Sequence, residues 1–273
     1  MTILVDMPPP KTTDAGGLEI SYYDMGRGGA VVLLHGIGSN GSGWSGQFAA
    51  LSAHHRVIAW DAPGYGGSSP LPAPAPAADD YAGALDDFLE ALGIVSCTLV
   101  GHSLGALMAA SFAARRPGKL DGLVLASCAL GYGSATEADY PDTIRNRLSD
   151  IRELGPRGLA EKRSPRLLTE RAGPDLRARI RETMAEVTPA GYEAATHMLA
   201  RSDIFADAPG IRCPTLVLCG DEDVITPDEG SKRVAAGIEG AQYVGLAGLG
   251  HACYVEGPDV FNDAVQAFLK GLD

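Results

Sequence analysis

The sequence is short of positive charge. Its 273 residues include 22 Lys and Arg against 34 Asp and Glu, which gives a formal net charge of −12. Proteins that bind nucleic acid neutralise its phosphates with clusters of Lys and Arg, so this balance argues against a polyanion as the main partner. We therefore expect a small-molecule partner and no nucleic acid.

Long hydrophobic runs are also missing. The most apolar stretch, residues 99–114, is interrupted by His102 and Ser103 and falls short of the ~18 apolar residues that span a bilayer. The first eleven residues contain Asp6 and three consecutive prolines, where a signal peptide has a basic start and an apolar core. We expect neither a signal peptide nor a membrane partner.

Cysteine is scarce, and its spacing does not suggest metal binding. The cysteines are odd in number, lie in or beside apolar runs and show no paired ligand spacing; they are Cys97, Cys128, Cys213, Cys219 and Cys253. Buried thiols in a reducing compartment account for this pattern. The sequence therefore predicts a cytoplasmic protein without a structural zinc.

Short apolar runs alternate with helix-like stretches, a pattern typical of an α/β protein with a mostly parallel sheet. The expected strands are short and rich in Val, Leu and Ile, as strands covered on both faces tend to be; they are Ala30–Leu34, Arg56–Trp60, Cys97–Val100, Leu123–Ala126, Thr215–Cys219 and Ala241–Leu246. Leu18–Asp24 and the first few residues are expected to add antiparallel edge strands. Apolar spacing and stop signals predict helices over Ala78–Leu92, Leu104–Arg115 and Asp259–Leu269.

Residues 131–206 have a different character. They lack convincing strands and are expected to form several short helices broken by prolines at positions 141, 156, 165, 174 and 189. Residues 145–181 hold 11 of the 22 Lys and Arg but only five acids, so this stretch is +6 and the rest of the chain is −18. We interpret residues 131–206 as a helical insertion into an α/β core formed by residues 1–130 and 207–273.

The segment Gly101-His102-Ser103-Leu104-Gly105 follows an expected strand and precedes an expected helix. A nucleophile at the tip of such a sharp turn sits in strained backbone geometry, and small neighbours let the chain turn tightly. The N-terminal dipole of the following helix points at the serine oxygen. The G-x-S-x-G pattern arises by chance in a chain with 35 glycines, so its weight depends on this context. We predict that Ser103 is an activated nucleophile.

A serine nucleophile needs a histidine base and an acid that orients the base. Among the six histidines, His251 follows the last expected strand, at the sheet edge where ligands gather. Asp221 and Asp223 both follow strand Thr215–Cys219; we favour Asp223 as the acid and assign Asp221 to the turn or to solvent. His197, in the insertion, is expected at the surface, with a place in the pocket as the alternative.

The oxyanion of a tetrahedral intermediate also needs hydrogen-bond donors. We expect the backbone N–H groups of Leu104, directly after the nucleophile, and of Ile37, in the Gly-rich loop 35–40, to provide them. Gly36 lets that loop approach the substrate, and His35 is expected to support the loop rather than act as a second base. Trp44 is a candidate substrate contact, with anchoring of its helix in the core as the alternative.

Taken together, these segments resemble the α/β-hydrolase fold over essentially the full chain. The order nucleophile, acid, histidine is kept, and the matching segments are His35-Gly36 with Trp44, Asp61–Ser68, Gly101–Gly105, Gly220–Pro227 and Gly250-His251. The resemblance implies a mostly parallel central sheet with helices on both faces, and a helical cap, residues 131–206, inserted after the sixth strand. It also implies a structural role for Asp61. The tail from Gly250 to Asn262 resembles the 3-oxoadipate enol-lactonase and small esterase branch.

The resemblance implies a cofactor-independent hydrolase that cleaves a carboxylic ester or an enol-lactone-like lactone through an acyl-enzyme, with Ser103, His251 and Asp223 as the triad. Carbon–carbon hydrolysis of a ring-fission product, a vinylogous diketone, is an alternative, although Ala252 stands where such enzymes usually carry tryptophan. A non-catalytic small-molecule-binding member of the fold is a third hypothesis. The basic stretch at residues 145–181 suggests a substrate that carries a carboxylate, but we favour the alternative of a solvated helical surface with interspersed acids.

Overall fold

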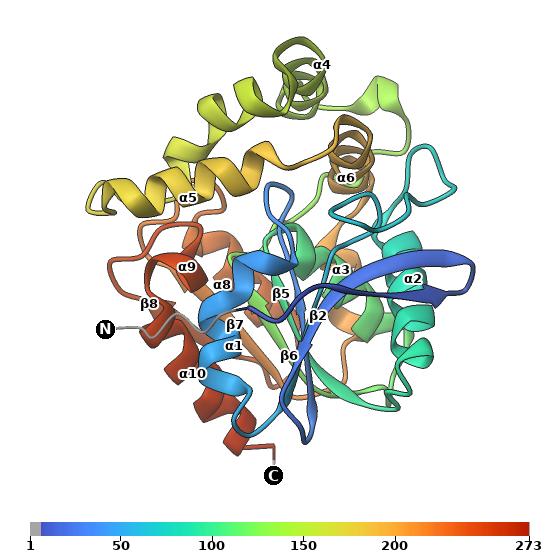
Figure 1. Cartoon of the computed structure of the whole chain (residues 1–273), viewed down its shortest axis with the longest axis vertical. Coiled ribbons are helices and arrows are strands. Elements are labelled where there is room, and N and C mark those ends of the chain that lie inside the picture. The colour runs from blue at the N-terminus through green and yellow to red at the C-terminus, as the bar shows by residue number, and fades with distance from the viewer. Residues whose placement is uncertain (1–6, 273) are drawn as a thin grey trace.

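The computed structural model describes residues 7–272 and is built around an eight-stranded sheet (Figure 1). The strands are β1 (Lys11–Ala15), β2 (Leu18–Met25), β3 (Ala30–Leu34), β4 (Arg56–Trp60), β5 (Cys97–His102), β6 (Leu120–Ala126), β7 (Thr215–Gly220) and β8 (Gln242–Leu246). Their order across the sheet is β1-β2-β4-β3-β5-β6-β7-β8. The β1–β2 and β2–β4 pairs are antiparallel and all other pairs are parallel, as the sequence predicts for most of the sheet.

Helices cover both faces of the sheet. α1 (Ser45–Leu51) and α10 (Pro258–Lys270) contribute to the hydrophobic core on one face, and α2 (Ala78–Ala91), α3 (Leu104–Arg115) and α8 (Asp228–Gly237) to the core on the other. β3 shows why both faces need cover: Val31 and Leu33 belong to the first core, Val32 and Leu34 to the second. Successive side chains point to opposite faces of a strand, so a strand buried on both sides is a continuous apolar run.

Residues 131–206, the inserted segment, lie above the carboxyl edge of the sheet (Figure 1). They contain η2 (Glu137–Asp139), α4 (Asp142–Arg163), η3 (Ser164–Arg166), α5 (Pro174–Ala185), α6 (Pro189–Arg201) and the start of α7 (Ile204–Asp207). Four of the five prolines stand at helix starts, where the absent N–H costs nothing. Pro156 instead lies inside α4, where Gly155 has φ 63° and ψ 179° and kinks the helix.

The two ends of the inserted segment meet at one place. Gly131 pairs with Asp203 in an isolated antiparallel bridge, and the Ile204 N–H donates to the Leu130 carbonyl at 2.9 Å. Gly131 has φ +80°, and a Cβ there would lie 1.9 Å from the Ser202 carbonyl oxygen, so only glycine fits. The chain therefore leaves the core and returns to it at neighbouring positions, which backbone hydrogen bonds hold together.

The observed elements agree closely with those expected. β3, β4 and α3 have the predicted bounds, and the short helices η1 (Gly41–Trp44), η4 (Ala208–Gly210) and α9 (Cys253–Glu256) complete the core. β2 lies inside the sheet rather than at its edge, because β1 pairs along its outer side. The edge strand expected from the first few residues lies outside the described residues at positions 1–6. Within residues 7–272, no helix has the length and hydropathy to cross a membrane.

Candidate active site

Ser103 forms the turn between β5 and α3 in a strained conformation. Its φ of 53° and ψ of −112° are unusual for a residue with a side chain, and within residues 7–272 only Ser127 shares a positive φ among non-glycine residues. The Ser103 N–H donates to the Ala126 carbonyl at 2.8 Å, and its own carbonyl accepts from the Ala129 N–H at 3.2 Å. Such strain persists only where the surrounding structure imposes it, which is characteristic of functional sites.

The two glycines of the motif are required by packing. A Cβ at Gly101 would lie 2.4 Å from the Gly105 carbonyl oxygen, and one at Gly105 would lie 2.2 Å from the Leu34 carbonyl oxygen. Both obstacles are backbone atoms in buried elements and cannot move aside. The glycines thus let the first turn of α3 press against β3 and β5, which fixes the helix N-terminus directly behind Ser103.

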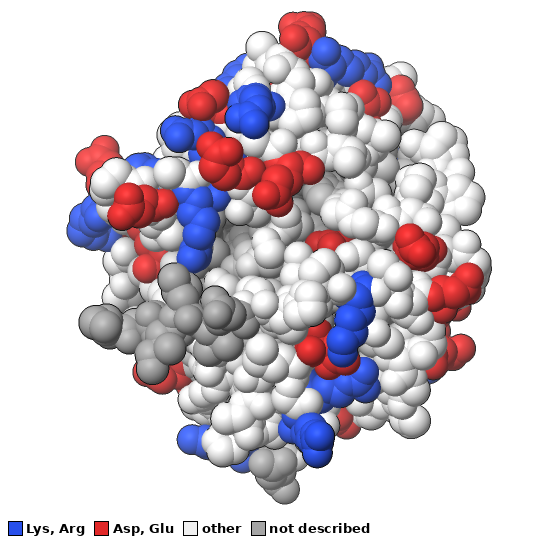
Figure 2. Space-filling model, viewed as in Figure 1, with Lys and Arg blue, Asp and Glu red and all other residues white. Residues whose placement is uncertain are grey.

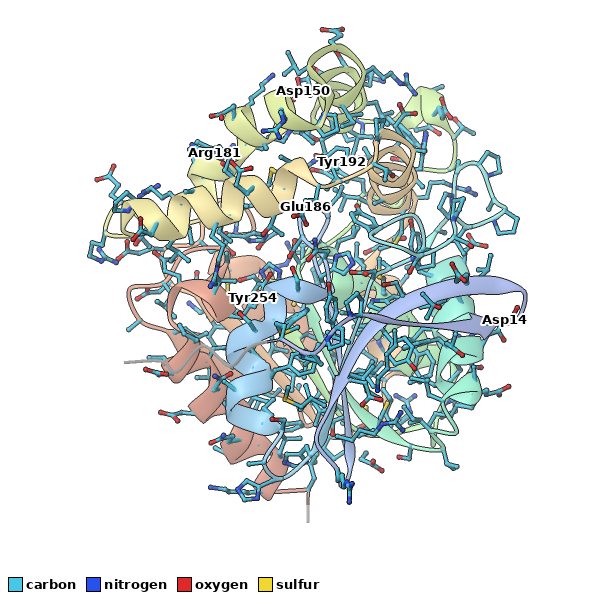
Figure 3. All side chains as sticks on the ribbon, in the orientation of Figure 1. Asp14, Asp150, Arg181, Glu186, Tyr192 and Tyr254 are labelled. Atoms are coloured by element: carbon cyan, nitrogen blue, oxygen red, sulfur yellow. The ribbon has the colours of Figure 1, made fainter. Side chains whose placement is uncertain are left out.

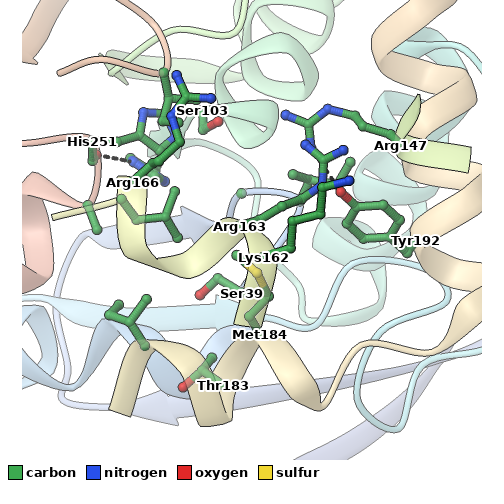
Figure 4. Close-up of a pocket in the computed structure, with 18 of the residues that line it drawn as sticks. Ser39, Ser103, Arg147, Lys162, Arg163, Arg166, Thr183, Met184, Tyr192 and His251 are labelled. Atoms are coloured by element: carbon green, nitrogen blue, oxygen red, sulfur yellow. Dashed lines mark hydrogen bonds between the residues drawn. The ribbon is translucent and has the colours of Figure 1, made fainter. Parts of the chain in front are cut away.

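His251 and Asp223 come from the loops that follow β8 and β7. The His251 Nδ1 lies 2.8 Å from Asp223 Oδ2, and both residues are buried. A carboxylate can only accept, so Nδ1 carries the proton and Nε2 is left to accept one. Ser103 and His251 line the same cavity and appear together at one wall of it in Figure 4.

The Asp223 carboxylate is held as an anion. Its Oδ1 accepts from the backbone N–H groups of Ile225 at 2.8 Å and Thr226 at 2.9 Å, and its Oδ2 accepts from the Thr226 hydroxyl at 2.8 Å. Burial alone raises the pKa of Asp223, but the charge and hydrogen bond of His251, with the two backbone donors, hold that pKa well below its ordinary value. A fixed negative charge therefore faces His251.

His102 supports the histidine loop from below. Its Nε2 lies 2.8 Å from the His251 carbonyl oxygen and must be the donor there, while its Nδ1 is buried without a partner. Burial, followed by the nearby His251, lowers the pKa of His102 to about 3. A neutral ring with a proton on Nε2 can hold His251 in place. Sequence reasoning gave His102 no role, because only the fold brings it under His251.

His35 holds the Gly-rich loop after β3. Its Nε2 accepts from the Ala62 N–H at 3.0 Å, so its Nδ1 carries the proton and donates to the Gly36 carbonyl at 2.9 Å. Both ring nitrogens are thus engaged with the backbone, and burial lowers the pKa of His35. This arrangement is that of a structural residue.

Ile37 and Leu104, the two predicted oxyanion donors, line one cavity together with Ser103. Leu104 is the first residue of α3, where backbone N–H groups have no partner within the helix. The Ile37 carbonyl accepts from the Tyr65 hydroxyl at 2.9 Å, which ties the loop after β3 to the segment that carries Tyr65. A Cβ at Gly36 would lie 3.2 Å from the Ser103 Cβ, so the loop passes close to the nucleophile. Tyr65 is a positioning residue that sequence reasoning missed.

Two adjoining cavities meet at Ser103. The larger measures about 710 Å³, and its lining includes Gly36, Ile37, Ser103 and His251 from the core and twelve residues between 143 and 192 from the inserted segment. The smaller measures about 390 Å³ and is mostly apolar; its lining includes Leu104, Cys128, Ala129, Leu130 and Leu199. Ser103, Ile37, Tyr132, Arg147 and Ile225 line both. Ser103 therefore lies where the two cavities join.

The inserted segment is fastened to the core around the larger cavity. The Asn40 amide donates to the Glu186 carboxylate at 2.7 Å, and Figure 3 shows Glu186 on the lower boundary of the inserted segment. On the other side, the Ala252 N–H next to His251 donates to the Leu167 carbonyl at 2.8 Å. Met184 packs against Gly38, where a Cβ would lie 2.6 Å from its terminal carbon. These contacts hold the residues above the cavity to the loop after β3 and to the loop that carries His251.

Three side chains singled out from the sequence lie away from the cavity. Trp44 is fully buried and stacks on Tyr254 at 4.2 Å between ring centroids, so the structure places it in the core and not among the cavity-lining residues. His197 is neither at the surface nor in the cavity lining: it is buried, and its Nδ1 lies 2.9 Å from the Tyr140 hydroxyl. Asp61 accepts from the Gly41 N–H at 2.9 Å and has a structural place, as expected.

Asp221, the alternative acid, is exposed and points away from the histidine. Its Oδ1 accepts from the Gly248 N–H at 2.7 Å and so closes the turn before the His251 loop. All five cysteines are free thiols, and all except Cys213 are buried. In the part of the chain that the structure describes, no group of three or more His, Cys, Asp or Glu is arranged to hold a metal ion.

A family model described as the alpha/beta hydrolase family matches residues 31–264. The chain belongs to the α/β-hydrolase family, and its fold is the one that this family implies. The predicted family resemblance is therefore confirmed, and the protein is a hydrolase of this fold.

Three known proteins illustrate the likeness. A putative carbamate hydrolase, RutD, from Klebsiella pneumoniae subsp. pneumoniae is 31% identical over 254 residues, which cover 89% of this chain and 91% of the relative. The structure of an enol-lactonase from Burkholderia xenovorans LB400 superposes with a TM-score of 0.88 at 28% identity, covering 95% and 100% of the two chains. A malate-bound thermophilic esterase from Thermogutta terrifontis gives 0.87 at 29% identity, covering 97% and 99%.

Proposed function

We propose that this protein is a cofactor-independent serine hydrolase that cleaves a carboxylic ester or a lactone through an acyl-enzyme. The observation that carries the proposal is the strained Ser103 at the wall of a cavity that it shares with His251, whose ring is fixed by Asp223 at 2.8 Å. The carbamate hydrolase, the esterase and the enol-lactonase named above support it, because carbamates, esters and lactones all carry a heteroatom leaving group on a carbonyl carbon.

The first half-reaction follows from the protonation states of these groups. Ser103 Oγ attacks the carbonyl carbon while His251 Nε2 takes its proton, and the resulting imidazolium is stabilised by the Asp223 carboxylate. The backbone N–H groups of Ile37 and Leu104 stabilise the oxyanion. The tetrahedral intermediate collapses, the alkoxide leaves with the proton from His251, and the acyl group stays on Ser103. In a lactone, alkoxide and acyl group remain one molecule.

The second half-reaction repeats these steps with water. His251 takes a proton from water, the hydroxide attacks the acyl carbon, and Ser103 leaves with the proton returned by His251. We assign the inserted segment, residues 131–206, as the cap that shapes the substrate pocket above this centre. The free, mostly buried thiols fit a reducing compartment, and we propose that the protein works in the cytoplasm.

A substrate screen with a matched variant tests the proposal. Esters, lactones and enol-lactones are offered to the wild type and to Ser103→Ala, alongside a ring-fission vinylogous diketone. We expect turnover of at least one ester or lactone, and a loss of several orders of magnitude in kcat in the variant. Turnover of the diketone alone would instead support carbon–carbon hydrolysis. Binding without any turnover would support a receptor-like member of the fold.

A further inference from the structure

The basic side chains of the inserted segment fall into two groups. On the outer face they lie beside acids, as Figure 2 shows in the upper part of the view. Examples are Arg152 with Glu193 at 2.9 Å, Arg171 with Glu222 at 2.7 Å and Arg181 with Glu161 at 3.4 Å. These pairs belong to a solvated surface and carry no information about a ligand.

The second group lines the larger cavity and is not neutralised. Its four cations are Arg147, Lys162, Arg163 and Arg166, and Figure 4 shows them around the space in front of Ser103 and His251. Among the described residues that line this cavity, Asp150 is the one acid; it pairs with Lys162 at 2.7 Å and Arg163 at 2.6 Å. The lining therefore carries a formal charge of +3, counting His251 as neutral.

Arg147 is the member of this group placed to meet a substrate. Its side chain is half-buried, and its Nη1 donates to the Tyr192 hydroxyl at 2.8 Å, a neutral acceptor. No ion pair to Arg147 occurs within the described part of the chain. A guanidinium that lines a cavity without a counter-charge is free to pair with an anionic group of a ligand. Its planar donors match a carboxylate better than any other common anion except phosphate.

The two cavities indicate which part of the substrate carries this charge. His251 must hand its proton to the leaving oxygen, so the leaving group departs on the side that His251 lines. His251 lines the larger cavity and is absent from the lining of the smaller one. The lining of the smaller cavity is mostly apolar but includes Arg233 and shares Arg147 with the larger cavity, whereas Lys162, Arg163 and Arg166 line only the larger one. The acyl group then belongs in the smaller cavity, beside Leu104, Cys128 and Leu199.

We propose that Arg147, with the basic lining of the larger cavity, forms a carboxylate-binding subsite that selects esters or lactones with an anionic group on the alcohol side of the scissile bond. This inference rests on the proposed hydrolase function, because the direction of the leaving group is defined by proton transfer from His251. Arg147 is a specificity-determining residue, and the chemistry remains with Ser103 and His251.

Matched acetate esters test this subsite. The anionic probe is the acetate of 3-(4-hydroxyphenyl)propanoate, and its neutral counterpart is the acetate of the corresponding amide; the methylene spacer keeps the leaving phenols electronically alike. Charge-assisted hydrogen bonds contribute about 10- to 100-fold in affinity or rate. We expect the wild type to favour the anionic probe in kcat/KM by about that factor. A reversed pair, phenyl hemiglutarate and its neutral amide, carries the charge on the acyl side and is expected to show a clearly smaller preference, because Lys162, Arg163 and Arg166 line only the larger cavity.

Variants assign the preference to Arg147. Arg147→Gln is expected to lose about 10- to 100-fold on the anionic probe and about threefold or less on the neutral one. Arg145→Gln, an exposed arginine of the same helix paired with Asp142, is expected to change neither. Tyr192→Phe removes the hydrogen bond but keeps the Arg147 charge, so it should retain most of the discrimination. Equal losses on both probes in Arg147→Gln, or equal preference in both pairs, would overturn the subsite.

A binding measurement separates this inference from the proposed function. In Ser103→Ala, 3-(4-hydroxyphenyl)propanoate and its amide are titrated by calorimetry, with and without Arg147→Gln. Tighter binding of the carboxylate, lost with Arg147→Gln, supports the subsite even if no ester is hydrolysed by the wild type. Hydrolysis of the neutral acetate with equal binding of acid and amide would leave the hydrolase standing and overturn the subsite.

Discussion

Asp223→Asn changes one atom in the triad and tests how His251 is oriented. The Asp223 Oδ1 accepts two backbone N–H groups, from Ile225 and Thr226, at 2.8 and 2.9 Å. An asparagine in the same place must direct its oxygen at those two donors, because its amide nitrogen cannot accept them. Its NH2 group then faces His251 Nδ1, which becomes the acceptor. The His251 proton moves to Nε2, the atom that must receive the proton of Ser103.

The expected cost of this tautomer change is large. Holding the wrong tautomer, with intact geometry, lowers kcat in a Ser-His-Asp triad by about 10⁴-fold. That factor corresponds to roughly 5 kcal/mol in the activation free energy, since each tenfold change is about 1.4 kcal/mol. Substrate binding does not involve Asp223 directly, as neither cavity includes it in its lining, so we expect KM to change by less than about threefold.

The assay compares two aspartates from the same loop. Steady-state kinetics on any ester that the wild type hydrolyses are measured for Asp223→Asn and for Asp221→Asn, whose carboxylate accepts one N–H from Gly248 at the surface. Asp221→Asn should stay within about threefold of the wild type. If Asp223→Asn keeps more than about a tenth of the wild-type kcat, or if Asp221→Asn loses more than Asp223→Asn, the assignment of the acid is wrong.

Two further variants probe the nucleophile turn and its support. Gly105→Ala places a Cβ 2.2 Å from the Leu34 carbonyl oxygen, so we expect at least about 2 kcal/mol of destabilisation and a lower Tm. The control Gly173→Ala has open space around the new Cβ and should keep a Tm near that of the wild type. Equal Tm values for the two variants would refute the packing argument. Burial, and secondly the nearby His251, lowers the pKa of His102 from its ordinary 6.5 to about 3. As the pH falls, His102 is therefore protonated in the unfolded chain before it is protonated in the folded one, so stability is lost between about pH 6.5 and pH 3. In His102→Gln, the free energy of unfolding measured by urea titration should fall less steeply with pH over that range. His35 is also buried with a lowered pKa and contributes equally to both proteins. An unchanged dependence of the free energy of unfolding on pH would contradict the neutral, buried His102 ring.

The order of motifs made it predictable from the sequence that Ser103, Asp223 and His251 come together, whereas their catalytic roles stay a prediction. Ser103 could be found because the turn geometry demands small neighbours at fixed spacing, and His251 because it follows a strand whose carboxyl end faces the site. Core strands such as Ala30–Leu34 could be delimited because burial on both faces leaves a continuous apolar run. These features depend on neighbours in the chain, so local pattern is enough.

Contacts between distant segments could not be predicted in the same way. For Trp44 the sequence left both the pocket and the core open, and its contact with Tyr254, more than two hundred residues away in the chain, decides for the core. His197 was expected at the surface, but Tyr140 covers it and bonds its ring. The basic stretch of residues 145–181 was visible as a charge excess, but which side of α4 faces the cavity, with Arg147 inside and Arg145 outside, depends on how α4 packs against α5 and α6.

Active-site labelling tests the central claim most directly. A fluorophosphonate reacts with a serine only when a base activates it and an oxyanion hole receives the phosphoryl oxygen. We expect the native protein to take up one equivalent, with the adduct located on Ser103 by mass spectrometry, esterase activity lost in step with labelling, and no adduct in Ser103→Ala. An unlabelled Ser103 in a folded protein, or full activity after Ser103 is labelled, would contradict the account.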